Sequence, residues 1–228
     1  MITTFLSQAW YVLLHSAPWM GWNLFLAVVP LILSVLLFRQ TQFRASTLTL
    51  PPIGLQTRHR SLLWWLGVVV FVAFLPNAPY ILTDIIHFIT NVQAADSVWF
   101  VTLFLIPLYV LFIAAGFEAY VLSLINLGAY LNQRGLARWI LLFEMVLHAL
   151  SAIGIYLGRF LRYNSWDLVT RLDEILRVIV DDLLGSRPIL VMLLIFLIVA
   201  GLYALVKPLH LAVFRHPRSR VARHYAID

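Results

Sequence analysis

Apolar residues fill most of the chain in long runs that short polar segments separate. Runs of about span length cover residues 22–38, 62–82, 98–118, 139–157 and 188–206. About twenty apolar residues are needed for a helix to cross the hydrocarbon core of a bilayer, where only helices and closed barrels satisfy every backbone group. The pattern predicts an all-α fold: a polytopic integral membrane helical bundle of about five transmembrane helices, with interfacial amphipathic helices.

The segments between and before these runs predict the domain organisation. Residues 1–21 are apolar and aromatic, but Pro18 interrupts them, so we expect an N-terminal interfacial segment; the alternative is an additional short span. Residues 22–206 form the transmembrane domain, and 207–228 a basic cytoplasmic tail. Between the last two runs, apolar residues recur at helical spacing. This spacing predicts an amphipathic helix at about 167–184 that lies in the interface plane.

Composition supports a membrane protein, since 62% of the 228 residues are hydrophobic and 11% are charged, against about 45–50% and about 25% in soluble domains. The absence of cysteine excludes disulfides and thiolate metal sites. No Lys or Arg occurs in the first 38 residues, so the positive region of a cleavable signal peptide is missing. We therefore expect insertion to begin from an uncleaved helix.

The distribution of the net charge of +6 predicts the orientation. Lys and Arg without neighbouring acids gather between residues 39 and 60, at 134 and 138, and after 206, whereas the basic residues between 158 and 187 are offset by acids. Positively charged loops stay on the cytoplasmic side. We expect a multi-pass protein of the cell (cytoplasmic) membrane with its N-terminus outside and its C-terminus inside. Basic tails also suit nucleic acid, but in so apolar a chain we expect no nucleic-acid partner.

One apolar run is interrupted by polar residues and prolines, in the stretch FLPNAPYILTDIIHF from Phe74 to Phe88. Pro76 and Pro79 each remove a backbone donor and should break or kink the helix. The predicted topology brings this stretch to the same membrane face as GRFLRYNSWD, residues 158–167. Two arginines there suit an anionic oxygen group. The hypothesis is a ligand-binding pocket at the extracytoplasmic interface, formed by Asn77, Asp84, His87, Arg159, Arg162, Asn164 and Asp167; the alternative is structural clamping by the same residues.

Three ionisable residues lie inside the predicted spans. Charged groups are costly within a bilayer, so they usually face the bundle interior. Glu118, Glu144 and His148 are a candidate proton relay; the alternative is a structural Glu144–His148 hydrogen bond, with Glu118 neutral or reaching an arginine. Because the HExxH, GxSxG and P-loop motifs are absent, we predict no metal and no cofactor and cannot name a catalytic residue.

Two stretches, FLPNAPYILTDIIHF at residues 74–88 and IYLGRFLRYNSWD at 155–167, together with WNLFLAVVPL at 22–31, resemble a prokaryotic family of multi-pass membrane proteins, domain of unknown function 1361. The resemblance extends over about residues 22–206. It implies a helical membrane domain, no established activity and no catalytic residues.

Three functions remain open from the sequence. The first is a non-enzymatic transporter or lipid- or solute-binding module, whose partners are membrane lipids and an anionic small molecule or headgroup. The second is a membrane enzyme acting on a lipid or lipid-linked substrate, with His87 or an Asp as acid–base. The third is a structural subunit of a membrane complex or oligomer.

Overall fold

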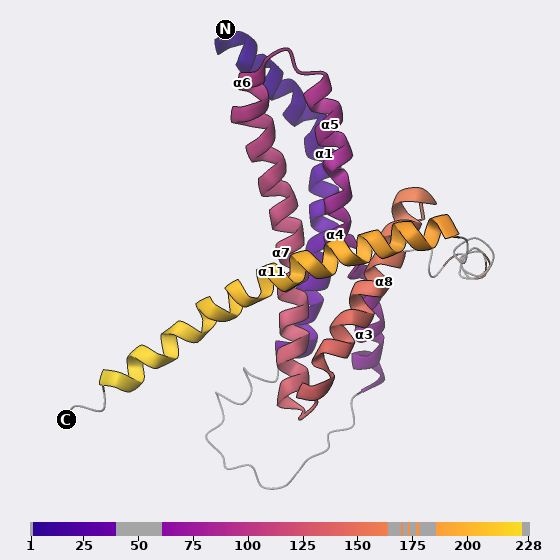
Figure 1. Ribbon diagram of the computed structural model, residues 1–228, viewed down its shortest axis with the longest axis vertical. Coiled ribbons are helices and arrows are strands. Elements are labelled where there is room, and N and C mark those ends of the chain that lie inside the picture. Colours follow the sequence, from indigo (N-terminus) through magenta and orange to yellow (C-terminus); the bar gives the residue numbers. More distant parts are fainter. Residues whose placement is uncertain are drawn as a thin grey trace.

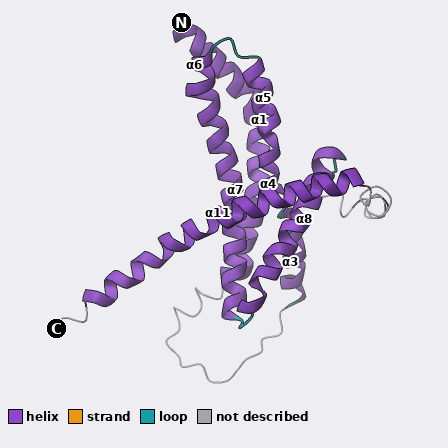
Figure 2. Ribbon diagram, in the orientation of Figure 1, coloured by secondary structure: helices purple, strands orange, loops and turns teal. Residues whose placement is uncertain are grey.

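The computed structural model describes residues 2–39, 61–163 and 186–224, and the single positions 170, 173 and 177. All regular elements within these residues are helical (Figure 2). They are α1 (Ile2–Ser34), η1 (Val35–Arg39), α3 (Leu62–Phe74), α4 (Asn77–Tyr80), η2 (Ile81–Asp84), α5 (Ile85–Gln93), α6 (Val98–Phe100), η3 (Val101–Leu105), α7 (Ile106–Gln133), η4 (Ala137–Trp139), α8 (Ile140–Phe160) and α11 (Ser186–His224).

Five continuous helical runs in the described part of the chain are long and apolar enough to cross a membrane. They cover Phe5–Arg39, Leu62–Gln93, Val98–Gln133, Ala137–Phe160 and Arg187–Ala212. The predicted all-α, multi-pass membrane fold is therefore confirmed. The first three runs hold 35, 32 and 36 residues, or about 48–54 Å at 1.5 Å per residue. They exceed a hydrocarbon core of about 30 Å, and such an excess is accommodated by tilt or by projection beyond the core.

The three long runs stand side by side, and α8 packs beside only one half of them (Figure 1). α11 lies obliquely across α8, touches α7, and then continues away from the bundle (Figure 1). The half of the three long runs that α8 does not reach consists of the start of α1 with α5 and α6. The described residues thus form a five-helix part and a three-helix extension.

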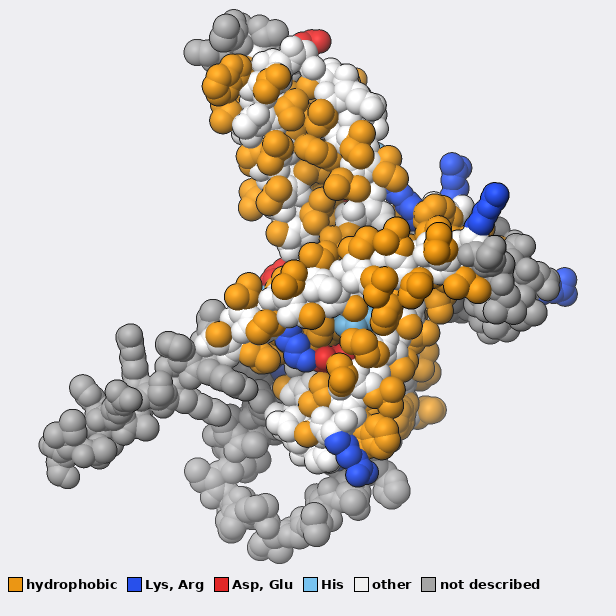
Figure 3. Space-filling model, in the orientation of Figure 1, with side chains coloured by type: hydrophobic (Ala, Val, Ile, Leu, Met, Phe, Trp, Pro, Cys, Tyr) orange, Lys and Arg blue, Asp and Glu red, His pale blue; other side chains and the backbone are white. Residues whose placement is uncertain are grey.

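Each part has its own apolar core. The main cluster joins residues such as Phe71, Ile81, Tyr120 and Ile155, and the extension has a separate cluster around Ala9, Phe100 and Leu105. Outside these clusters, large apolar side chains cover the helices and charged ones are sparse on the visible face (Figure 3). An apolar exterior of this kind suits a lipid environment.

Three details differ from the sequence-based boundaries or lie beyond the described residues. α1 is continuous through Pro18, so no break separates residues 1–21 from the first span. α11 continues past Val206 to His224, so the basic tail begins as a helix. The predicted amphipathic helix at 167–184 falls mostly outside the described residues, of which Thr170, Asp173 and Arg177 are helical.

Candidate functional site

The proline-containing stretch interrupts the α-helical hydrogen bonding without ending the run. Pro79 lacks the N–H that would bond the Leu75 carbonyl, and Leu75 O instead accepts from Ala78 N at 3.2 Å. That shift takes Ala78 N away from Phe74 O, which accepts from Asn77 Nδ2 at 2.9 Å. The Asn77 side chain therefore satisfies a carbonyl that the break releases. The chain then tightens into a 3₁₀ turn, Ile81–Asp84, before α5 begins.

Asp84 ends this irregular segment and is buried, with 1% of its surface exposed. Its Oδ2 accepts a hydrogen bond from Asn23 Nδ2 on α1 at 2.8 Å. Its Oδ1 lies 3.6 Å from Arg159 Nη1 on α8, and no hydrogen bond reaches that oxygen from the described residues. Asp84 thus links α1 to α8, but only one of its two oxygens is hydrogen-bonded.

Arg159 reaches the same place from the end of α8. Its Nη2 donates to the Thr83 carbonyl at 3.1 Å, and its Nη1 lies 3.5 Å from the Tyr80 hydroxyl. We call Asn23, Tyr80, Thr83, Asp84 and Arg159 the Arg159 junction. Two glycines bring the helices close enough to form it, because a Cβ at Gly154 would lie 2.7 Å from the Pro76 ring and one at Gly158 would lie 3.3 Å from Tyr80.

The end of α8 has a second feature, a non-glycine residue with a left-handed backbone. Arg162 has φ 60°, and Tyr163 N donates to Leu157 O at 3.1 Å. The left-handed position that follows the end of a helix is usually glycine. The Arg162 side chain is exposed.

The residues predicted to form one pocket are only partly brought together. Asp84 and Arg159 meet, Asn77 bonds within its own segment, and Arg162 is exposed at the end of α8. The His87 ring lies 4.5 Å from that of Trp19. Asn164 and Asp167 lie outside the described residues. Whether this group binds a ligand stays a prediction.

Three members of the junction, Asn23, Tyr80 and Thr83, were not predicted from the sequence as site residues. A signal existed for Asn23, since it is an amide within an apolar run. Tyr80 and Thr83 gave none, because one contributes through its ring and hydroxyl and the other through its backbone carbonyl.

A second polar group ties α11 to α8. Glu144 accepts hydrogen bonds from Lys207 Nζ at 2.6 Å and 2.8 Å, and from the Tyr203 hydroxyl at 2.7 Å. The Glu144 side chain is 7% exposed and that of Lys207 27% exposed. Both oxygens of the buried Glu144 carboxylate thus accept hydrogen bonds, while the Lys207 side chain stays partly exposed.

His148 lies one turn along α8 from Glu144 and is fully buried. Its Nδ1 is 2.7 Å from the Tyr120 hydroxyl, which lies 3.4 Å from Ser151 Oγ. Its Nε2 has no hydrogen-bond partner among the described residues. We call Tyr120, Glu144, His148, Ser151, Tyr203 and Lys207 the Lys207 cluster.

Glu118, the third member of the predicted relay, pairs elsewhere. Its Oε1 lies 2.6 Å from His210 Nε2 on α11. Glu144 bonds Lys207 and Tyr203 rather than His148, and Glu118 bonds a histidine rather than an arginine. Lys207, Tyr203 and His210 were not predicted as partners; Lys207 and His210 lie in the segment assigned to the tail, and Tyr203 lies in the fifth apolar run. The relay itself remains a prediction.

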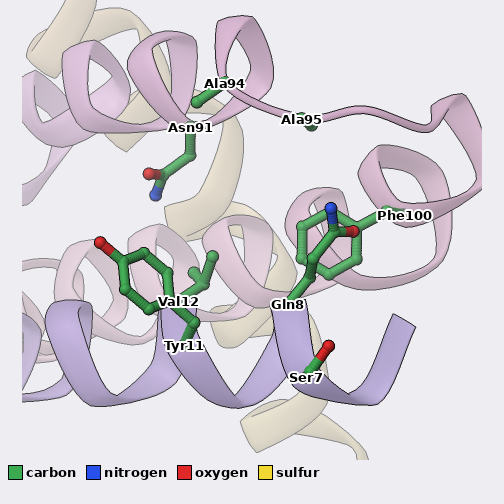
Figure 4. Close-up of a pocket in the computed structure, with 8 residues that line it drawn as sticks. All are labelled: Ser7, Gln8, Tyr11, Val12, Asn91, Ala94, Ala95 and Phe100. Atoms are coloured by element: carbon green, nitrogen blue, oxygen red, sulfur yellow. The ribbon is translucent and has the colours of Figure 1, made fainter. Parts of the chain in front are cut away.

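The structure also contains an open pocket at the far end of the three-helix extension, with a volume of about 380 Å³ (Figure 4). It lies away from both polar groups, between the start of α1, the end of α5 and α6. The described residues contain no group of three or more His, Cys, Asp or Glu able to hold a metal ion.

Comparison with known proteins identifies the family. Residues 22–200 match the family described as Protein of unknown function (DUF1361). The match covers most of the 228 residues, so the chain belongs to this family, as the sequence motifs predicted. No curated protein and no solved structure matches the chain.

Proposed function

We propose that this member of the DUF1361 family is a membrane-embedded binding module that holds an anionic headgroup, or a small anionic solute, beside the end of α8. The observation that carries the proposal is the conformation of Arg162. A non-glycine residue in the left-handed region costs about 1–2 kcal/mol, and glycine would end the helix without that cost. Backbone strain that persists beside a candidate site favours a role for the side chain.

Arg159 supports the same site. Its guanidinium has five N–H donors in a planar fork, and the described contacts use only Nη1 and Nη2. Its side chain is 19% exposed. Since Asp84 is buried on the inner side of Arg159, the outward side of the two arginines carries positive charge, which suits phosphate or carboxylate oxygens.

The test replaces Arg162 with glycine. Arg162→Gly removes the side chain and suits the backbone, so the protein should become more stable by about 1 kcal/mol while its retention of phosphatidylglycerol falls. Stability is measured by thermal unfolding in detergent, and retention by native mass spectrometry. Arg138→Gln, at the opposite end of α8, is the matched control and should keep the lipid. Unchanged lipid retention in Arg162→Gly would contradict the proposal.

The location and orientation belong to the same proposal. The site faces outward if the N-terminus is outside and the C-terminus is in the cytoplasm of a prokaryotic cell, as the basic loops favour. Because the chain has no cysteine, a thiol reagent labels only a cysteine that is introduced by substitution. Ser186→Cys should react with an impermeant thiol reagent in intact cells, whereas Thr57→Cys and Ser219→Cys should be protected; the reverse pattern would invert the orientation.

A further inference from the structure

The pocket at the far end of the extension is built by three separate elements. Asn91 points into it from α5, and Gln8 and Tyr11 point toward it from α1 (Figure 4). Its walls are lined by Ser7, Gln8, Tyr11, Val12, Asn91, Ala94, Ala95 and Phe100. A volume of about 380 Å³ falls at the lower end of the range for small-molecule sites.

The polar groups around this pocket are rich in hydrogen-bond acceptors. Gln8 Nε2 donates to Asp96 Oδ2 at 2.9 Å, so the amide of Gln8, which lines the pocket, holds an exposed carboxylate next to it. Asn91 Nδ2 donates to the Tyr109 hydroxyl at 2.9 Å. Since each amide is engaged through its NH₂ group, each keeps its carbonyl oxygen as an acceptor.

The chain around the pocket contains no Lys or Arg, and His15 stacks on the ring of Tyr11. No Lys or Arg occurs at positions 1–38 or 61–133, which include every residue that lines the pocket. Asp96 is the charged group beside it. Two aromatic rings, Tyr11 and Phe100, also line the pocket, and ring faces attract cations.

The position along the helices places the pocket at or beyond the membrane surface. From Phe100 to the end of α7 at Gln133, the helical run rises about 50 Å. A bilayer with its headgroup regions is about 40–45 Å thick. If Gln133 lies at one membrane surface, the pocket at the other end of the run lies in the headgroup layer of the opposite surface or in the water beyond it.

From these observations we infer that the pocket binds a small organic ammonium group, carried by a lipid headgroup or by a free amine. The nitrogen lies against the Asp96 carboxylate and the amide oxygens of Gln8 and Asn91. Its alkyl substituents lie against the rings of Tyr11 and Phe100. The site is independent of the proposed anion site at Arg159 and Arg162, because the two share no residue and call for ligands of opposite charge.

The test uses the purified full-length protein and isothermal titration calorimetry with tetramethylammonium chloride and with ethanolamine hydrochloride. The wild type should bind at least one of them saturably at constant ionic strength. Asp96→Asn should weaken binding about tenfold, and Tyr11→Leu about two- to fivefold, the usual strength of an exposed cation–π contact. Asp173→Asn, an exposed acid in another segment, is the matched control and should bind as the wild type does.

A second arm distinguishes the two sources of the ammonium group. In nanodiscs, phosphatidylethanolamine should compete with tetramethylammonium if the natural ligand is a lipid, and phosphatidylglycerol should not; competition by neither lipid assigns a free amine. The inference is overturned if the wild type binds none of the ammonium compounds saturably, or if Asp96→Asn binds as tightly as Asp173→Asn. Since these measurements leave Arg162 unchanged, their failure is distinct from failure of the anion site.

Discussion

The Arg159 junction and the Lys207 cluster both place an oppositely charged pair among apolar helices, yet they are built differently. In the Lys207 cluster, Glu144 receives three short hydrogen bonds, all from side chains of α11. In the Arg159 junction, Asp84 receives one hydrogen bond and lies 3.6 Å from Arg159, which also bonds a backbone carbonyl. The first pair depends on its two charges, whereas the second rests on an irregular backbone and close helix packing.

The difference indicates how each region holds its helices. α11 packs mainly on α8, and the Glu144–Lys207 pair adds a charged contact to the apolar ones that Val199 and Tyr203 make with the main cluster. The segment around Asp84 is also fixed by contacts with α1, α7 and α8. We therefore expect the Lys207 cluster to be more sensitive to loss of a charge, and the Arg159 junction to be more sensitive to loss of close packing.

The largest effect is expected from Glu144→Ala. Removing one member of a buried pair costs about 3–5 kcal/mol, and the outward reach of Lys207 places the expected loss near the lower end, at about 3 kcal/mol. Thermal unfolding in detergent measures it. Glu118→Ala is the matched control: Glu118 makes a single contact with His210, and one side-chain hydrogen bond between membrane helices contributes about 0.6 kcal/mol on average. Equal losses would remove the distinction between the two pairs.

Gly154→Ala should have the next largest effect and tests packing in the Arg159 junction. The new methyl group would lie 2.7 Å from two atoms of the Pro76 ring, which cannot rotate away, so α8 and α4 must separate at a cost of about 1–3 kcal/mol. Gly201→Ala is the control, because nothing lies within 4 Å of its Cβ position; it should leave stability unchanged or raise it. A neutral Gly154→Ala would show that the close approach is unnecessary.

Asp84→Asn should have the smallest effect of the three. Asparagine keeps an acceptor for Asn23 and removes the charge that faces Arg159, which retains the Thr83 carbonyl. The expected loss is about 1 kcal/mol, measured by the same unfolding assay. A loss larger than that of Glu144→Ala would reverse the comparison and make the Arg159 junction the more charge-dependent region.

The sequence by itself determined the membrane class, the helical fold and the positions of the five apolar runs. Each depends on a local sum of hydropathy over about twenty residues, which needs no knowledge of neighbours in space. The two prolines also predicted an irregularity at residues 74–88, because a missing N–H acts within one turn of its own helix. Pro18 lies inside the continuous helix α1, since membrane helices tolerate a proline where other groups satisfy the freed carbonyls; an interfacial position for residues 1–21 stays a prediction.

Only the tertiary structure decided the partners. Asp84 and Arg159 were expected together because the topology placed both at one membrane face, but Asn23 came from a helix 61 positions away. Glu144 and His148 lie one turn apart, yet their partners are Lys207 and Tyr120. The rotation of each helix about its axis selects these pairs, and that rotation is set by contacts such as Gly154 on Pro76. Such contacts join residues far apart along the chain, so local hydropathy carries no record of them.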